Sequence, residues 1–545
     1  MSSNTLIEVF GHILFSFTRG VTEHYNPQEP EYAAESFGYD PLESTGREWY
    51  HHGDPNEECI YQEYSDREAT SLDYRVRSNS HEIRVLNACS IEENDETQED
   101  HEDKIEAMAW KQLRPSALRT VCKSMYIGAL VSLLTATIIG SVYILICYLS
   151  FSTLNNCEFY PKRSIPVKVQ WVRSISDIIS NVLLYPSFFV CSLFLYRQDQ
   201  LMGVKRKLIL ITCLAYLLDT IYRVVLQAIG ISNSKLSTLQ KVPLNILFFM
   251  SVFCGACLLT NHFRHLWTSW KQRLALFLQM TVPFCSVIIV AVPVVTIIYP
   301  VYNKQSKESA LRLVIAVFAP LIGVLFKVIS RILVQRQESI THPGYSCALL
   351  APLYCVSAIM FRVLQADLDS LESIAILGLI HGATEVMERS TMVVIDHICH
   401  VVLKRTSAPW GSFRTPRCER LMADIAIMSM LFESTAIMYV NGLLHLYRYI
   451  YLKDDSLLKL LQSFATTTSV QLVIEWFFTS VSLAIETRYQ NMAVMAVWQR
   501  RWKRHILLAI ATTMLSALWI SANLLDMAHE RFKEPLNQPC KMPFA

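Results

Sequence analysis

From residue 121 to the C-terminal region, the sequence contains many apolar runs of roughly 20 residues. A helix rises about 1.5 Å per residue, so a run of this length matches the hydrocarbon core of a bilayer. In lipid, backbone polar groups find no water, and a single segment satisfies them internally only as a helix. The sequence therefore predicts an all-α fold, a polytopic membrane helical bundle, and excludes a single soluble domain.

We expect about eleven membrane spans. They are predicted at residues 125–151, 175–196, 207–230, 242–260, 276–299, 311–334, 345–364, 371–403, 421–446, 464–486 and 505–527. Numbered from a cytosolic N-terminus, the connections on the inner side carry 22 Lys and Arg residues and those on the outer side carry 14. This bias favours a cytosolic N-terminus and a C-terminus on the opposite side.

Charge divides the chain into two unlike parts. Residues 1–120 hold 25 acidic and 10 basic residues, whereas residues 121–545 hold 22 and 39. An acidic segment with little apolar surface repels itself and cannot offset the entropy of folding. We expect a short amphipathic helix at 1–20, an acidic and mostly disordered cytosolic tail at 21–110, and the transmembrane helical domain at 121–545.

The span predicted at 371–403 is unusually polar. At 100° per residue, most of its ionisable side chains fall on one face roughly 120° wide. They are His381, Glu385, Glu388, Arg389, Asp396 and His400. Such a face must point towards other helices or water, and its i,i+4 pairs can partly neutralise one another along the helix. It predicts a proton or ion relay; a helix lying on the membrane surface and a structural ion-pair network are the alternatives.

A second polar stripe follows the span at 464–486, where Gln471, Glu475 and Glu486 recur at helical spacing. Two striped helices predict a shared polar interior. In that interior Glu385, Glu388 and Glu475 would carry negative charge, and His381 and His400 would exchange protons. Arg389 would be a fixed counter-charge or an anion ligand, and Asp396 and Gln471 would complete the lining.

Metal binding is left open by the sequence. Two HxxH pairs occur, His262 with His265 and His397 with His400, but neither has an adjacent third histidine. Two histidines three residues apart need further ligands from elsewhere. Asp396 with His400 has better ligand spacing than either pair.

Several classes of function are disfavoured by the sequence. It contains no P-loop and no GxGxxG, so no nucleotide cofactor is expected, and no catalytic residues are assigned. The acidic soluble part argues against nucleic-acid binding. The interpretation favoured is an ion- or proton-coupled transporter or a channel-like protein in a lipid bilayer. The alternatives are a signalling or scaffold protein, whose acidic tail binds a cytosolic partner, and a membrane-embedded metal-dependent enzyme.

Overall fold

The structure is a computed structural model. It describes residues 117–154, 165–196, 200–231, 236, 238–263, 269–299, 301, 309–335, 343–366, 371–404, 416–452, 456–488, 492 and 494–532. Within these residues the secondary structure consists of helices without strands, as the apolar runs predict. The amphipathic helix expected at 1–20 and the acidic tail expected at 21–110 lie outside the described residues.

The helices follow one another along the chain with short connections. They are α6 (Ala117–Leu134), η2 (Thr135–Ile139), α7 (Gly140–Leu154), α8 (Val167–Leu184), α9 (Ser187–Leu195), α10 (Lys205–Ala228), α11 (Thr238–His262), α12 (Trp270–Pro293), η7 (Val294–Ile298), α14 (Ser309–Gln335), α15 (Pro343–Ser346), η8 (Cys347–Leu349), α16 (Ala351–Ala366), α17 (Leu371–Lys404), α18 (Pro416–Tyr447), η9 (Arg448–Leu452), α19 (Leu457–Arg488) and α20 (Val494–Phe532).

Eight helical stretches in the described part are long and apolar enough to cross a membrane. They are Thr120–Ile146, Val167–Leu195, Lys205–Ala228, Val242–His262, Trp270–Pro293, Cys347–Ala366, Arg420–Ile450 and Leu457–Thr487. Each coincides with a span predicted from the sequence. The other three predicted spans fall on helices α14, α17 and α20, which are not among the eight.

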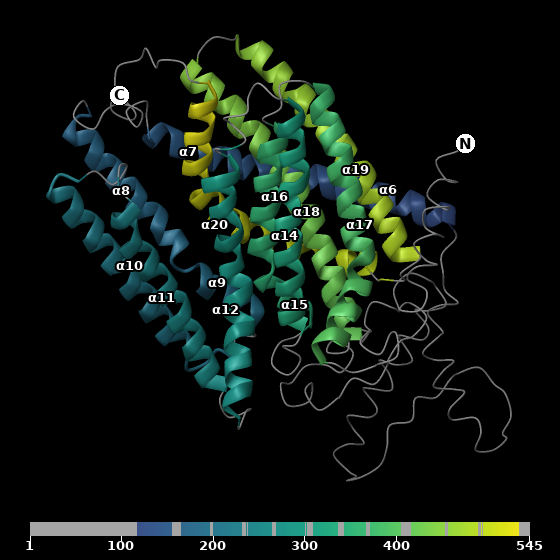
Figure 1. Ribbon diagram of the computed structural model, residues 1–545, viewed down its shortest axis with the longest axis horizontal. Coiled ribbons are helices and arrows are strands. Elements are labelled where there is room, and N and C mark those ends of the chain that lie inside the picture. Colours follow the sequence, from purple (N-terminus) through teal and green to yellow (C-terminus); the bar gives the residue numbers. More distant parts are fainter. Residues whose placement is uncertain are drawn as a thin grey trace.

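Helices α16 and α18 form the centre of the bundle. In each of these two spans 94% of the apolar stretch is buried, against 17% in α10. Figure 1 shows α16 and α18 among α14, α17 and α19, with α10 and α11 at the edge of the molecule. A helix that is buried all round needs neighbours on every side, so any charge on α16 or α18 faces protein.

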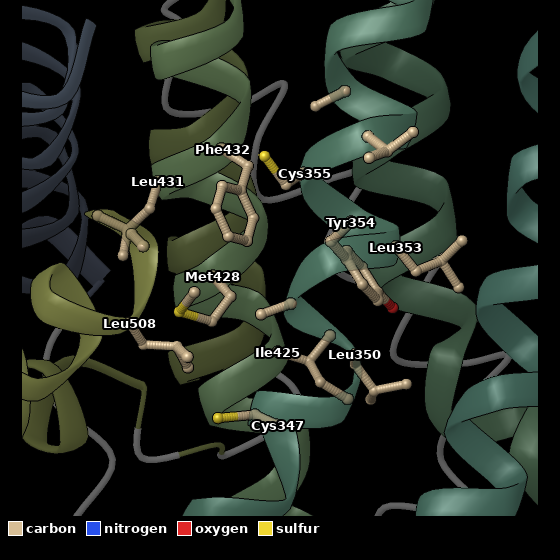
Figure 2. Close-up of a cluster of buried hydrophobic side chains, with 14 of the residues drawn as sticks. Cys347, Leu350, Leu353, Tyr354, Cys355, Ile425, Met428, Leu431, Phe432 and Leu508 are labelled. Atoms are coloured by element: carbon tan, nitrogen blue, oxygen red, sulfur yellow. The ribbon is translucent and has the colours of Figure 1, made fainter. Parts of the chain in front are cut away.

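Apolar side chains pack between α16 and α18. In Figure 2, Tyr354 and Cys355 of α16 lie opposite Met428 and Phe432 of α18, and Leu508 of α20 lies close to Met428. These side chains belong to the largest buried apolar cluster in the described part of the chain. This packing fixes the two central helices relative to each other.

Proline and π-helical turns interrupt the regular helices. Pro186 separates α8 from α9, and Pro293 ends α12 just before the π-turn η7. Proline removes a backbone donor and crowds the preceding turn, which explains both interruptions. Pro283, in contrast, lies inside the continuous helix α12.

A glycine brings α17 and α19 close together. A Cβ atom added to Gly382 would overlap Cδ2 of Phe478, so the phenyl ring packs where a side chain would otherwise be. Gly382 follows His381 on α17, and Phe478 lies one turn from Glu475 on α19. The absence of a side chain at Gly382 therefore lets the two polar stripes approach each other.

A candidate polar core between five helices

Charged side chains from α14, α16, α17, α18 and α19 converge inside the bundle. We call this set the polar core: Lys327, Arg331, Arg362, His381, Glu385, Glu388, Arg389, Asp396, Glu433, Glu475 and Glu486. All are buried apart from His381 and Glu388, whose side chains are 15% and 10% exposed. Buried charges are expensive unless they are paired, so the pairing pattern determines what the core can do.

Arg362 of α16 is the central cation. Its Nε and Nη2 donate to Oε2 of Glu433 on α18 at 3.0 and 2.9 Å, and Nη2 also pairs with Glu475 on α19. Its Nη1 donates to Oε1 of Gln365 at 2.9 Å. Arg362 is 2% exposed. It therefore pairs with two carboxylates in a site that solvent does not reach.

Arg389 of α17 is held by α19. Its Nε and Nη2 donate to the two oxygens of Glu486, each at 2.8 Å. Two parallel hydrogen bonds between a guanidinium and a carboxylate form the strongest type of ion pair in proteins. Arg389 is therefore held in a bidentate ion pair that joins α17 to α19.

Glu385 lies beside Arg389 without a direct bond to it. Nη1 of Arg389 is 3.8 Å from Oε1 of Glu385, which is beyond hydrogen-bond distance. The same oxygen accepts a hydrogen bond of 3.0 Å from the hydroxyl of Ser429 on α18. Glu385 is 9% exposed. Its hydrogen-bond donor is a neutral hydroxyl, whereas the other carboxylates of the core accept hydrogen bonds from charged side chains.

His381 completes a small cluster with Glu385 and Glu433. Its Nε2 lies 3.3 Å from Oε2 of Glu433. One ligand atom from each of the three residues lies within 4.8 Å of the other two, which makes this the group in the described residues that could hold a metal ion. Histidine nitrogen with two carboxylate oxygens suits divalent transition metals.

Two further pairs connect α14 to α17. Nζ of Lys327 is 3.3 Å from Oε2 of Glu388, and it also lies 4.8 Å from the centre of the Tyr354 ring. Arg331 donates to Asp396 through Nε at 2.9 and 3.0 Å and through Nη2 at 2.5 Å. These contacts place the polar face of α17 against protein.

Six of the eight side chains predicted for the polar interior meet in the polar core: His381, Glu385, Glu388, Arg389, Asp396 and Glu475. Gln471 lies on the same helix as Glu475 but pairs with Asn441, whose amide donates to it at 3.3 Å. The side chain of His400 lies outside the described residues.

The partial neutralisation expected along α17 is present between Glu385 and Arg389, which lie 3.8 Å apart. The charged partners of His381, Glu388 and Asp396 among the described residues lie on other helices. Asp396, the residue first considered for a metal, is engaged by Arg331 and by Nε2 of Gln335 at 2.5 Å. The reason is geometric, because bundle packing brings long side chains of neighbouring helices nearer than an i+4 neighbour.

The sequence interpretation missed three basic residues of the core, Lys327, Arg331 and Arg362. Each stands in an otherwise apolar run, and an isolated base at that depth is itself a signal because it needs an acidic partner. Ser429 was also missed, since a single hydroxyl in a membrane helix has no distinguishing pattern.

The polar core holds more negative than positive charge. It contains six carboxylates and four Lys or Arg side chains, so two carboxylates are in excess when His381 is neutral. Lys327, Arg331 and Arg389 each have one direct carboxylate partner, and Arg362 is shared by Glu433 and Glu475. The excess consists of one charge of that shared pair and the charge of Glu385.

The eight apolar helices around this core define a multi-pass membrane protein. Comparison with protein-family models, with curated proteins and with solved structures found no match for the chain.

Proposed function

We propose that the protein is an ion- or proton-coupled transporter or channel-like protein, and that the polar core is its exchange site. The observation that carries this proposal is the excess of two buried carboxylates over cations. A net charge of this kind is expensive in a low-dielectric interior. It is relieved when protons or another cation enter the site, which is the event that a coupled transporter uses.

Glu385 and His381 are the proton carriers in this proposal. Glu385 can gain a proton without losing a hydrogen bond from a cation, because its hydrogen-bond donor is neutral: the Ser429 hydroxyl donates to it at 3.0 Å, and Nη1 of Arg389 lies 3.8 Å away. When His381 is protonated, its Nε2–H donates to Glu433 at 3.3 Å. Histidine titrates near physiological pH, so it suits this role. With one proton on each of the two residues, the polar core is neutral.

Protonation of Glu385 and His381 would change the contacts between α17 and α18. Ser429 and Glu433 connect α17 to α18 through Glu385 and His381, whereas Glu486 connects α17 to α19 through Arg389. A change of charge at Glu385 and His381 alters the first set of contacts and leaves the bidentate pair intact. Such a differential interaction is what shifts a protein between two conformations.

The topology proposed with this function has eleven spans and a cytosolic N-terminus. Helices α14, α17 and α20 would complete the count, with the polar faces of α14 and α17 covered by their partners. A charged face is tolerated at membrane depth when it points into a bundle. The basic bias of the inner connections supports the orientation.

The variant E385Q tests this function in liposomes. Gln keeps the shape and can still accept the Ser429 hydrogen bond, but it cannot exchange a proton. We expect wild-type protein to dissipate a pH gradient reported by an enclosed pH-sensitive dye, and E385Q to fall to nearly the rate of empty liposomes.

The matched control is E372Q, because Glu372 is an exposed glutamate in the first turn of the same helix. This variant should keep the wild-type rate. A folded E385Q protein that dissipates the gradient at the wild-type rate, with an unaltered pH profile, would refute the proposed function.

A further inference from the structure

We propose that His381, Glu385 and Glu433 bind one divalent first-row transition-metal ion, of the Zn²⁺ class. This inference rests on the proposed function of the polar core and specifies the ion that the core exchanges.

The geometry of the three side chains is close to that of a metal site. His381 and Glu385 are one helical turn apart on α17, and Glu433 faces them from α18. Ligands about 2.1 Å from a tetrahedral zinc ion lie roughly 3.4 Å from one another. Nε2 of His381 and Oε2 of Glu433 are already 3.3 Å apart, and the Glu385 ligand atom lies within 4.8 Å of both. A small side-chain rotation of Glu385 would complete the set.

The donor atoms select the class of metal. One imidazole nitrogen and two carboxylate oxygens suit Zn²⁺, Mn²⁺ or Fe²⁺ better than the soft Cu⁺ ion or the hard Mg²⁺ ion. Three protein ligands leave a fourth position for water, as in zinc sites that exchange their ligands. An ion held this way can leave again, which a transport site requires.

Neighbouring side chains already orient both carboxylates. The Ser429 hydroxyl donates to Glu385, and Arg362 donates to Oε2 of Glu433. Hydrogen bonds of this kind fix ligands around a metal and tune its affinity. The positive charge of Arg362 would repel a metal ion bound at Glu433. Glu475, which also pairs with Arg362, balances this charge.

The charge of the core matches a divalent ion. The core holds two more carboxylates than Lys and Arg side chains, so an ion of charge +2 neutralises the excess. A monovalent ion would leave one negative charge uncompensated.

Calorimetric titration of Zn²⁺ into the full-length protein tests this inference. The protein would be purified in detergent and freed of metal by a chelator. We expect one bound Zn²⁺ per protein chain. The variants H381N and E385Q should bind about tenfold more weakly or worse. E372Q should bind as the wild type does, and unfolding temperatures would verify that every variant is folded.

The two proposals fail separately. Wild-type protein without Zn²⁺ binding, or folded H381N and E385Q proteins with unchanged affinity, would overturn the metal site; flux of protons in the liposome assay would still support the transporter. Zn²⁺ binding without any flux would overturn the transporter and support the metal site.

Discussion

Replacement of Arg362 by Gln is expected to destabilise the folded protein by about 3–5 kcal/mol. Arg362 is the shared partner of Glu433 and Glu475, and a neutral amide would leave both carboxylates without their cation. Removing one partner of a buried pair is costly because it leaves an uncompensated charge in a low-dielectric site. Thermal unfolding of purified R362Q, monitored by tryptophan fluorescence, measures this loss, and the yield of folded protein should fall with it.

The double variant R362Q/E475Q distinguishes charge from packing. It removes one of the two stranded carboxylates and leaves Glu433 in contact with His381 at 3.3 Å. The double variant should therefore recover part of the stability that R362Q loses. If R362Q alone unfolds at the wild-type temperature, or the second change lowers stability further, the account of Arg362 as the shared counter-ion is wrong.

Replacement of Arg331 by Met is the second change with a large expected effect. Arg331 is 0% exposed and contacts Asp396 through several hydrogen bonds, so R331M should also cost about 3–5 kcal/mol of stability. Replacing both charges of a buried pair is often nearly neutral. The double variant R331M/D396N should thus unfold close to the wild-type temperature, because the amide introduced by D396N can still accept a hydrogen bond from Gln335.

This double variant also separates structure from transport. Arg331 and Asp396 balance each other, so removing both leaves the excess charge at Glu385 unchanged. R331M/D396N should keep the wild-type flux in liposomes. A stable double variant without flux would contradict the proposal that Glu385 and His381 carry the protons and that the Arg331–Asp396 pair is structural.

The polar face of α17 was predictable from the sequence, but the partners of its side chains were not. The 100° step between residues is a local property of the helix, so His381, Glu385 and Glu388 could be placed on one face without knowledge of the fold. Which helix covers that face depends on packing between segments far apart in the chain. The contact of His381 with Glu433, across 52 residues, follows from that packing and from no local pattern.

The missing cations illustrate the same limit. The predicted stripes contain more acidic than basic residues. Lys327, Arg331 and Arg362, on other helices, supply positive charge opposite them. The sequence could not predict which acidic residue pairs with which base, because several acidic residues lie at a similar depth in the bundle.

In the proposed mechanism Glu385 exchanges protons, whereas the carboxylates bound to arginine do not. Hydrophobic carbodiimides react with protonated carboxyl groups, so mass spectrometry of peptides from the labelled, folded protein tests this claim directly. We expect labelling of Glu385 that increases as the pH falls, together with little labelling of Glu486, whose two oxygens accept hydrogen bonds from Arg389. Glu385 unlabelled at every pH, or labelled no faster than Glu486, would contradict the account.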